Sequence, residues 1–397
     1  MTATYVFLGP SLPLDEAREL LDAHYLPPVS CGDITDLVLD REPPAAIGIV
    51  DGLFEQVPTV WHKEILFALS KGVRVFGASS MGALRAAELH TFGMEGVGGI
   101  FEAFRDGRYT DDDEVTIVHA PAEDGYRSLS EAMVNLRHGL AAARDAGHIG
   151  AVTHDRLVRA AKETFYPERS WGRVLQDGRS LGLPEAELDA LRSFTRGTAP
   201  DAKRDDARAL LTHMRGTLEA GRPPFTPDFD FEPTFYWEKL LTVVRQQRTE
   251  REVSRLLGVS ATALIDHLSA VDPGAVDRAL GEVLVRQEAD RLGVLVPEET
   301  RGRHAARHRP PHGAHGDGAL TDLLAERDAL REVLAKRLQG ELAGPVLRSL
   351  AETGRLDAVR EALAARPVPP SGATVPAAGE EIPADSPRVP EPSGRRE

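Results

Sequence analysis

Apolar and polar positions follow two different patterns along the chain. In the first 150 residues, short apolar runs at 4–8, 46–50 and 73–76 alternate with stretches whose apolar residues recur at helical spacing. Buried strands that alternate with helices are typical of a sheet with helices on both faces. The pattern therefore predicts an α/β fold for residues 1–150, with a three-layer sheet domain.

Beyond residue 150 the strand-like runs almost disappear, and stretches rich in Ala, Leu, Arg and Glu replace them. We interpret residues 151–365 as an all-helical accessory domain, with a His/Pro-rich linker at about 301–318. Residues 366–397 are rich in Pro, Ala, Gly and charge. Such a composition buries too little apolar surface to fold, so this segment should be a disordered tail.

One stretch, residues 73–88, reads as a strand, a turn of small residues and a helix. The turn has the sequence Ala-Ser-Ser-Met-Gly, which is the small-x-Ser-x-small spacing of a nucleophile elbow centred on Ser80. The free N–H groups that open the following helix suit an oxyanion. Alternatively, Ser79 or Ser80 simply caps the helix, although no Glu or Gln stands three residues later to complete a capping box.

Other polar residues stand where the predicted strands and helices meet. Asp51 follows the second apolar run, at the carboxyl edge where open parallel sheets place their sites, although an Asp before Gly also forms turns. His62 and Lys63 lie near the start of the next predicted helix, where His62 flanks the apolar stripe and a structural role is the alternative. His119 ends a short strand predicted for residues 114–119.

These residues contain the parts that acyl-transfer chemistry needs, namely a nucleophile, a base and an oxyanion trap. Ser80 can serve as the nucleophile, and the amides that follow it can form the trap. His62, His119 or Lys63 can serve as the base, and their spacing alone does not choose between them.

Composition narrows the classes of function. The net charge of −15 argues against a nucleic-acid-binding surface, which needs a basic footprint. Cys31 is the only cysteine, so no internal disulfide can form and the cytoplasm is the natural compartment. We see no apolar run long enough to span a bilayer and expect no membrane association.

Two clusters invite a metal interpretation. The four acids of residues 111–114 contain oxygen ligands for a hard cation, but a solvated acidic loop is the favoured interpretation. Four histidines lie at 304, 308, 312 and 315, but Pro310 and Pro311 break their helical face and no Cys or acid cluster joins them. We therefore expect neither a metal nor another cofactor.

Several blocks of the sequence resemble the TfuA-like family, and they come in that family's order. The resemblance covers about residues 4–140 and thins beyond them. The blocks that carry it are Asp51-Gly52-Leu53-Phe54, Trp61-His62-Lys63-Glu64-Ile65, residues 79–89 from Ser-Ser-Met-Gly-Ala onward, Phe92-Gly93-Met94-Glu95-Gly96-Val97-Gly98 and Asp111-Asp112-Asp113-Glu114-Val115.

The resemblance implies a role beside YcaO enzymes, which install backbone thioamides in peptides. TfuA-like proteins are implicated in freeing sulfide from a thiocarboxylated, ThiS-like sulfur-carrier protein and in helping the YcaO enzyme engage its substrate. We therefore expect an accessory hydrolase with a YcaO-type enzyme and a ThiS-like carrier as partners. The alternative is a non-catalytic adaptor that docks the YcaO enzyme, its peptide substrate or the carrier, and a hydrolase unrelated to sulfur is a weaker third.

The hydrolase hypothesis assigns roles to individual residues. Ser80 attacks the thiocarboxylate, His62 or Lys63 is favoured as the base, and Asp51 orients that base. The expected binding residues are Ser79, Arg85, Glu88 and His119. Among them, Arg85 grips an anionic end of the substrate, and Glu88 stands three positions later on the same helix face.

Overall fold

The computed structural model of the protein describes residues 3–39, 43–53, 57–196, 199–221, 223–294, 296–308 and 318–364. The chain divides into two compact units, Met1–Leu264 and Ile265–Glu397. The tail predicted at 366–397 lies outside the described residues.

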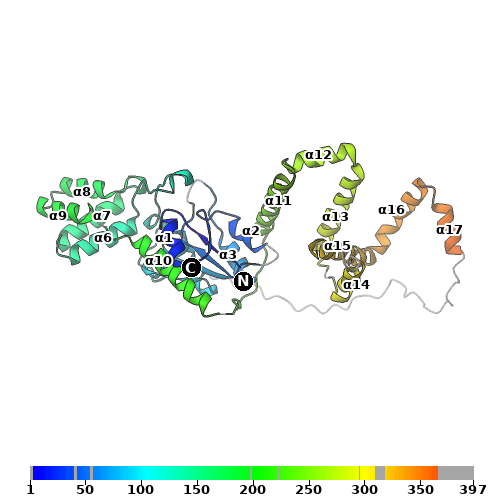
Figure 1. Ribbon diagram of the computed structural model, residues 1–397, viewed down its shortest axis with the longest axis horizontal. Coiled ribbons are helices and arrows are strands. Elements are labelled where there is room, and N and C mark those ends of the chain that lie inside the picture. The colour runs from blue at the N-terminus through cyan, green and yellow to red at the C-terminus, as the bar shows by residue number, and fades with distance from the viewer. Residues whose placement is uncertain are drawn as a thin grey trace, which may run out of the picture. The chain divides into compact units, whose positions relative to one another are not determined.

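The first unit contains a five-stranded parallel sheet, which confirms the predicted α/β fold (Figure 1). Its strand order is β2-β1-β3-β4-β5. The strands are β1 (Thr4–Phe7), β2 (His24–Leu26), β3 (Ala46–Ile49), β4 (Arg74–Gly77) and β5 (Glu95–Gly96). Chain order reverses between β1 and β3, and the carboxyl edge at such a switch point is where doubly wound sheets place ligands.

Helices cover both faces of the sheet. One face carries α1 (Leu14–Leu20) and α10 (Ala202–Glu219), whose apolar residues join Val6, Val50 and Phe76 in one core. The other face carries α2 (Asp33–Val38), α3 (His62–Ser70), α4 (Met81–Leu89) and α5 (Gly99–Arg105) over a second core. One face of the sheet is therefore covered in part by α10, a helix from the segment that was predicted to form a separate helical domain.

A bundle of four further helices belongs to the same unit. These are α6 (Met133–Asp145), α7 (Ala151–Glu163), α8 (Trp171–Ser180) and α9 (Glu185–Arg196). They enclose a core of their own that includes Leu136, Leu140, Leu157 and Leu188. The long helix α11 (Phe235–Leu257) contacts α2, and its Trp237 packs beside Phe67 of α3. The compact unit thus extends well past residue 150.

The connection between α5 and α6 is irregular. It contains the 3-10 turns η2 (Asp112–Glu114) and η3 (Ala122–Asp124), and its one bridge pairs His119 with Ser128. The strand predicted for residues 114–119 is therefore wrong. The reason is that the polar groups of this segment bond outside any ladder: the Val118 N–H donates to Ser130 Oγ at 2.8 Å.

The described part of the second unit is helical, as predicted. Its helices are α13 (Pro273–Arg291), α14 (Glu298–His308), α15 (Gly318–Arg337), α16 (Gln339–Glu352) and α17 (Leu356–Ala364), and α12 (Ala261–Val271) precedes them. Residues 301–308 of the predicted linker belong to α14, and 309–317 lie outside the described residues. His304 and His308 hydrogen-bond to Glu332 and Asp328, both at 2.9 Å. Within the described ranges, no three His, Cys, Asp or Glu side chains gather as metal ligands.

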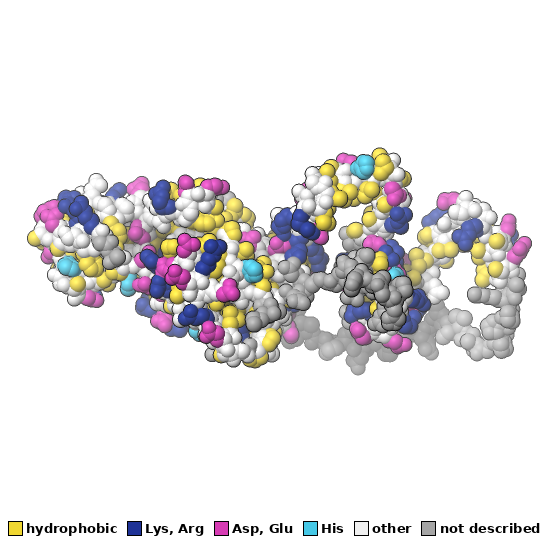
Figure 2. Space-filling model, in the orientation of Figure 1, with side chains coloured by type: hydrophobic (Ala, Val, Ile, Leu, Met, Phe, Trp, Pro, Cys, Tyr) yellow, Lys and Arg dark blue, Asp and Glu magenta, His cyan; other side chains and the backbone are white. Residues whose placement is uncertain are grey.

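Among the helices that are described, none is long and apolar enough to cross a membrane. Acidic and basic side chains are interspersed over the sheet unit on the face that Figure 2 shows.

Candidate functional site

Asp51 ties two loops together at the carboxyl edge of the sheet. It follows β3 and is 2% exposed. One carboxylate oxygen accepts the N–H groups of Gly9 at 2.9 Å and Ser11 at 3.1 Å, and the other accepts Ser11 Oγ at 2.6 Å. Asp51 thereby fixes the loop between β1 and α1. These contacts give it a structural role, and none of them is to a histidine or a lysine.

The turn between β4 and α4 is strained and tightly packed. Ser79 has φ 67, a left-handed value that costs a residue with a side chain roughly 1–2 kcal/mol. Its hydroxyl is buried and has no hydrogen-bond partner among the described residues. A Cβ on Gly82 would lie 1.8 Å from the carbonyl oxygen of Ile49, so the start of α4 can approach β3 only through a glycine. Strain and unpaired polar groups of this kind concentrate at functional sites.

Ser80 occupies the N-cap position of α4, but its side chain makes no capping hydrogen bond. The Ser80 N–H donates to the Ala78 carbonyl oxygen at 2.8 Å, and the N–H groups of Gly82 and Ala83 donate to Val50 and Ser80. The Met81 N–H, which directly follows Ser80, donates to none of the described residues. The Ser80 hydroxyl does not cap the helix, and the next N–H along the chain, that of Met81, has no acceptor among the described residues.

Ser80 lines a cavity of about 300 Å³ at this edge of the sheet. We call it the sheet-edge cavity. Its walls come from the loop after β1, the segment after β3 and the turn at Ser80. The irregular connection adds Val115 and residues 117–121, and two later helical segments add Tyr166 and Lys203. Asp51 and His119 also line it. The structure thus brings three predicted residues, Asp51, Ser80 and His119, to one cavity.

Lys203 is the charged residue that sequence reasoning missed. It lies in the first turn of α10, is 3% exposed, and its Nζ donates to the Val115 carbonyl oxygen at 3.0 Å. Burial lowers the pKa of Lys203, although Asp51 and other nearby carboxylates partly offset this effect. A buried lysine with a lowered pKa in a cavity is a strong candidate for proton transfer.

His62, Lys63, Arg85 and Glu88 do not line the sheet-edge cavity. Glu88 Oε2 accepts His62 Nε2 and Arg85 Nη1, both at 2.7 Å. Burial alone would raise the pKa of Glu88, but these two partners outweigh it and the pKa is lowered. Lys63 Nζ lies 4.9 Å from the ring centroid of Phe231. We call His62, Arg85 and Glu88 the surface triad.

The acidic stretch of residues 111–114 is paired with cations. Arg137 binds Glu114 through two hydrogen bonds of 2.9 and 2.8 Å. Asp113 accepts Arg169, whose side chain is 1% exposed, and also Lys162. The loop is therefore not simply solvated. Three cations hold the segment that continues into the wall of the sheet-edge cavity.

Residues 51–170 match the model of the family described as TfuA-like protein. No curated protein matches the chain. The matched segment includes Asp51, Ser80, His119 and the acidic stretch, and it ends before Lys203.

Proposed function

We propose that the protein is an accessory enzyme of peptide backbone thioamidation, because residues 51–170 match the model of the TfuA-like family, which is associated with thioamide formation. It hydrolyses the C-terminal thiocarboxylate of a ThiS-like carrier and supplies sulfide to a YcaO-type enzyme. The observation that carries the proposal is the sheet-edge cavity, where Ser80 and the buried Lys203 line the same space.

In this mechanism Ser80 is the nucleophile. Its hydroxyl is not used in capping the helix, and it faces a cavity large enough for the narrow end of a polypeptide. The Met81 N–H is the proposed donor for the oxyanion, because it follows the nucleophile directly and donates to none of the described residues. The positive end of the α4 dipole adds to this stabilisation.

Lys203 is the proposed base. A lysine can accept a proton only in its neutral form, and burial favours that form. The tie to the Val115 carbonyl oxygen holds Nζ at the cavity wall. His119 lines the same cavity, with Nδ1 2.8 Å from the Ala120 carbonyl oxygen, and is the second group able to move a proton.

The reaction proceeds in two steps. The Ser80 oxygen bonds to the thiocarboxylate carbon, and its proton passes to Lys203. The carbon–sulfur bond then breaks, the proton leaves with sulfur as HS⁻, and the carrier remains as an ester on Ser80. Water, deprotonated by Lys203, attacks this ester and the bond between the acyl carbon and the Ser80 oxygen breaks. Lys203 returns the proton to the serine oxygen, and the carrier leaves as a carboxylic acid that ionises to an ordinary carboxylate.

The proposal is tested by sulfide release from purified thiocarboxylated carrier. The wild type should release sulfide catalytically, and Ser80→Ala should lose at least about a hundredfold in rate while still binding its partners. Circular dichroism controls for folding. If the wild type releases no more sulfide than the carrier alone but still binds a YcaO-type enzyme or the carrier, the adaptor function replaces the hydrolase.

A further inference from the structure

Helix α6 connects the core of the four-helix bundle with the sheet-edge cavity. Its Leu136 and Leu140 belong to the bundle core, and its Val134 belongs to a core of the sheet. The helix also packs against α10, which carries Lys203, and against η2, which precedes the cavity wall at Val115. The surroundings of the proposed base are therefore built partly on α6.

The backbone of Lys203 is fixed by a side chain of α6. Lys203 lies in the first turn of α10, where a backbone N–H has no partner within the helix. Its N–H donates instead to Asn135 Oδ1 at 3.1 Å. The same amide group donates through Nδ2 to Glu131 Oε1 at 2.9 Å. Asn135 is buried and bonded at both ends, so it sets the position of the first turn of α10 relative to α6.

The side chain of Lys203 is fixed by a series of contacts that also starts on α6. Arg137 Nε and Nη2 donate to the two carboxylate oxygens of Glu114 at 2.9 and 2.8 Å. The Glu114 side chain is 4% exposed and also pairs with Lys162 Nζ at 3.0 Å. The next residue is Val115, whose carbonyl oxygen accepts Lys203 Nζ at 3.0 Å. Because a two-donor contact fixes the direction of a carboxylate as well as its distance, Arg137 limits the movement of this carbonyl group.

The bond to Val115 determines where the Lys203 amine can accept a proton. A neutral amine has one lone pair, and a hydrogen bond from one of its N–H groups restricts the direction of that lone pair. Among the described residues, the Val115 carbonyl oxygen is the one hydrogen-bond acceptor of Lys203 Nζ. Burial lowers the pKa of Lys203, and three carboxylates oppose this effect. They belong to Asp51, Asp201 and Glu131, and the His119 ring lines the same cavity.

We propose that α6 positions the amine of Lys203 for proton transfer. Asn135 holds the backbone of the lysine, and the Arg137–Glu114 pair holds its side chain through the carbonyl group that follows Glu114. The inference rests on the proposed function, in which Lys203 is the base. Arg137 and Glu114 are positioning residues, because they act through Val115 and neither of them lines the sheet-edge cavity. The four-helix bundle thereby has a role in the reaction, which is to hold α6 in place.

The pKa of Lys203 in the full-length protein tests the proposal without any measurement of activity. NMR titration of lysine labelled with ¹³C at Cε gives this pKa, since the chain has six lysines and Lys203→Met assigns the signal. A charge effect alone would raise the Lys203 pKa in Arg137→Met, which loses a cation, and lower it in Glu114→Gln, which loses an anion. Loss of positioning lets water reach Nζ and weakens the effect of burial. We therefore expect the pKa to rise by at least about one pH unit in both variants.

Opposite shifts in these two variants, or an unchanged pKa in Arg137→Met, would overturn the proposal. Circular dichroism controls for folding. If Glu114→Gln does not fold, Arg137→Lys replaces it, because it keeps the charge and loses the two-donor contact. A rise in the Lys203 pKa in Arg137→Lys supports positioning, and an unchanged pKa contradicts it.

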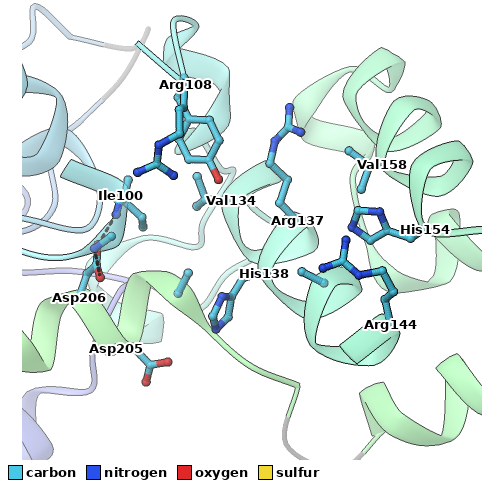
Figure 3. A pocket seen from close by; sticks show the side chains of 14 residues that line it. Ile100, Arg108, Val134, Arg137, His138, Arg144, His154, Val158, Asp205 and Asp206 are labelled. Carbon is cyan, nitrogen blue, oxygen red and sulfur yellow. Dashed lines mark hydrogen bonds between the residues drawn. The ribbon is translucent and has the colours of Figure 1, made fainter. Parts of the chain in front are cut away.

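Arg144→Met is the matched control. Arg144 lies on the same helix as Arg137, and both side chains line a second cavity of about 470 Å³ (Figure 3). Arg144 pairs with Asp145, an exposed residue of the same helix, and not with Glu114. The Lys203 pKa should be unchanged in this variant. A shift as large as that of Arg137→Met would overturn the assignment to the Arg137–Glu114 pair.

Sulfide release distinguishes a failure of this inference from a failure of the proposed function. Arg137→Met should lower kcat at least about tenfold and change KM by less than about threefold, because Arg137 positions the base and does not touch the substrate. A wild type that releases no sulfide contradicts the proposed function. A wild-type kcat in Arg137→Met, in an active enzyme, contradicts the positioning role.

Discussion

Charged residues occupy two contrasting regions beside α4. In the surface triad, His62 and Glu88 expose 48% and 44% of their side chains, so their polar groups remain in contact with water. In the sheet-edge cavity, Lys203 is 3% exposed and its pKa is lowered by burial. Exposed ion pairs typically contribute less than about 1 kcal/mol, whereas burying a lysine destabilises the charged form. A buried lysine therefore calls for a functional explanation more strongly than the triad does.

The largest effect should follow from removing the buried amine of Lys203. Lys203→Met keeps the length of the side chain but cannot accept a proton, so sulfide release should fall by about 10²–10⁴. Measured rates across pH provide the control, because Lys203→Met should also lose the rise in rate that deprotonation of a lysine produces. A variant that keeps most of the wild-type rate would contradict the assigned base.

Although Lys203→Met should lower the rate of sulfide release, it should not lower the free energy of unfolding at neutral pH. Because the lowered pKa means that the unfolded chain binds the Lys203 proton more tightly, the stability of the wild type should rise with pH relative to Lys203→Met. At neutral pH the methionine variant should be as stable as the wild type or more so. Urea titrations at several pH values measure this, and a strongly destabilised variant would indicate that the lysine holds the fold.

Asp206 is a buried acid whose pKa, like that of Lys203, is shifted by burial. Burial raises the pKa of Asp206 from 3.8 to about 6. The folded state thus holds this proton more tightly, so its stabilising effect is complete below pH 3.8 and is lost as the pH rises through 6. At about 1.4 kcal/mol per pH unit, the change is on the order of 3 kcal/mol. Asp206→Asn should lack this pH dependence in urea titrations, and parallel curves for both proteins would contradict the shift.

Ser79 offers a smaller effect. Ser79→Ala removes a buried hydroxyl that has no partner among the described residues, so the free energy of unfolding should rise by about 1 kcal/mol. Sulfide release should stay within about tenfold of the wild type, because Ser80 lines the cavity and Ser79 does not. Loss of release in Ser79→Ala with retention in Ser80→Ala would shift the nucleophile by one residue.

The smallest effect should come from the surface triad. His62→Ala breaks an exposed pair with Glu88, and Arg85 still binds the same carboxylate oxygen. Stability should change by less than about 1 kcal/mol and sulfide release by less than about twofold. A loss of release as large as that of Lys203→Met would restore His62 as the base and reverse the comparison between the two regions.

Local patterns predicted much of the sheet because its central strands β3 and β4 are mostly apolar, with Arg74 as their one charged residue. The runs before Asp51 and before Ser79 became β3 and β4, and their carboxyl ends lie side by side, since Ile49 pairs with Gly77. By contrast, β2 and β5 span three residues and two residues, which is too short for a hydrophobic period to be recognised.

The base could not be predicted, because the residues around Ser80 come from distant parts of the chain. The sequence predicts that His62 lies beside the apolar stripe of its helix. It does not predict that the packing of α3 against α4 brings His62 to Glu88. One feature of the sequence could have identified Lys203. It lies on the apolar stripe of α10, four, seven and eleven residues before Ala207, Leu210 and Met214. A lysine on such a stripe indicates a buried charge.

The most direct test of the central claim is detection of the covalent intermediate. Thiocarboxylated carrier is mixed with the protein, the reaction is quenched with acid within one turnover, and the products are measured by intact and peptide mass spectrometry. The account predicts an adduct of the carrier, less its sulfur as H₂S, on the peptide that contains Ser80, and none with Ser80→Ala. Catalytic sulfide release that persists in Ser80→Ala, or an adduct on any other residue, would contradict it.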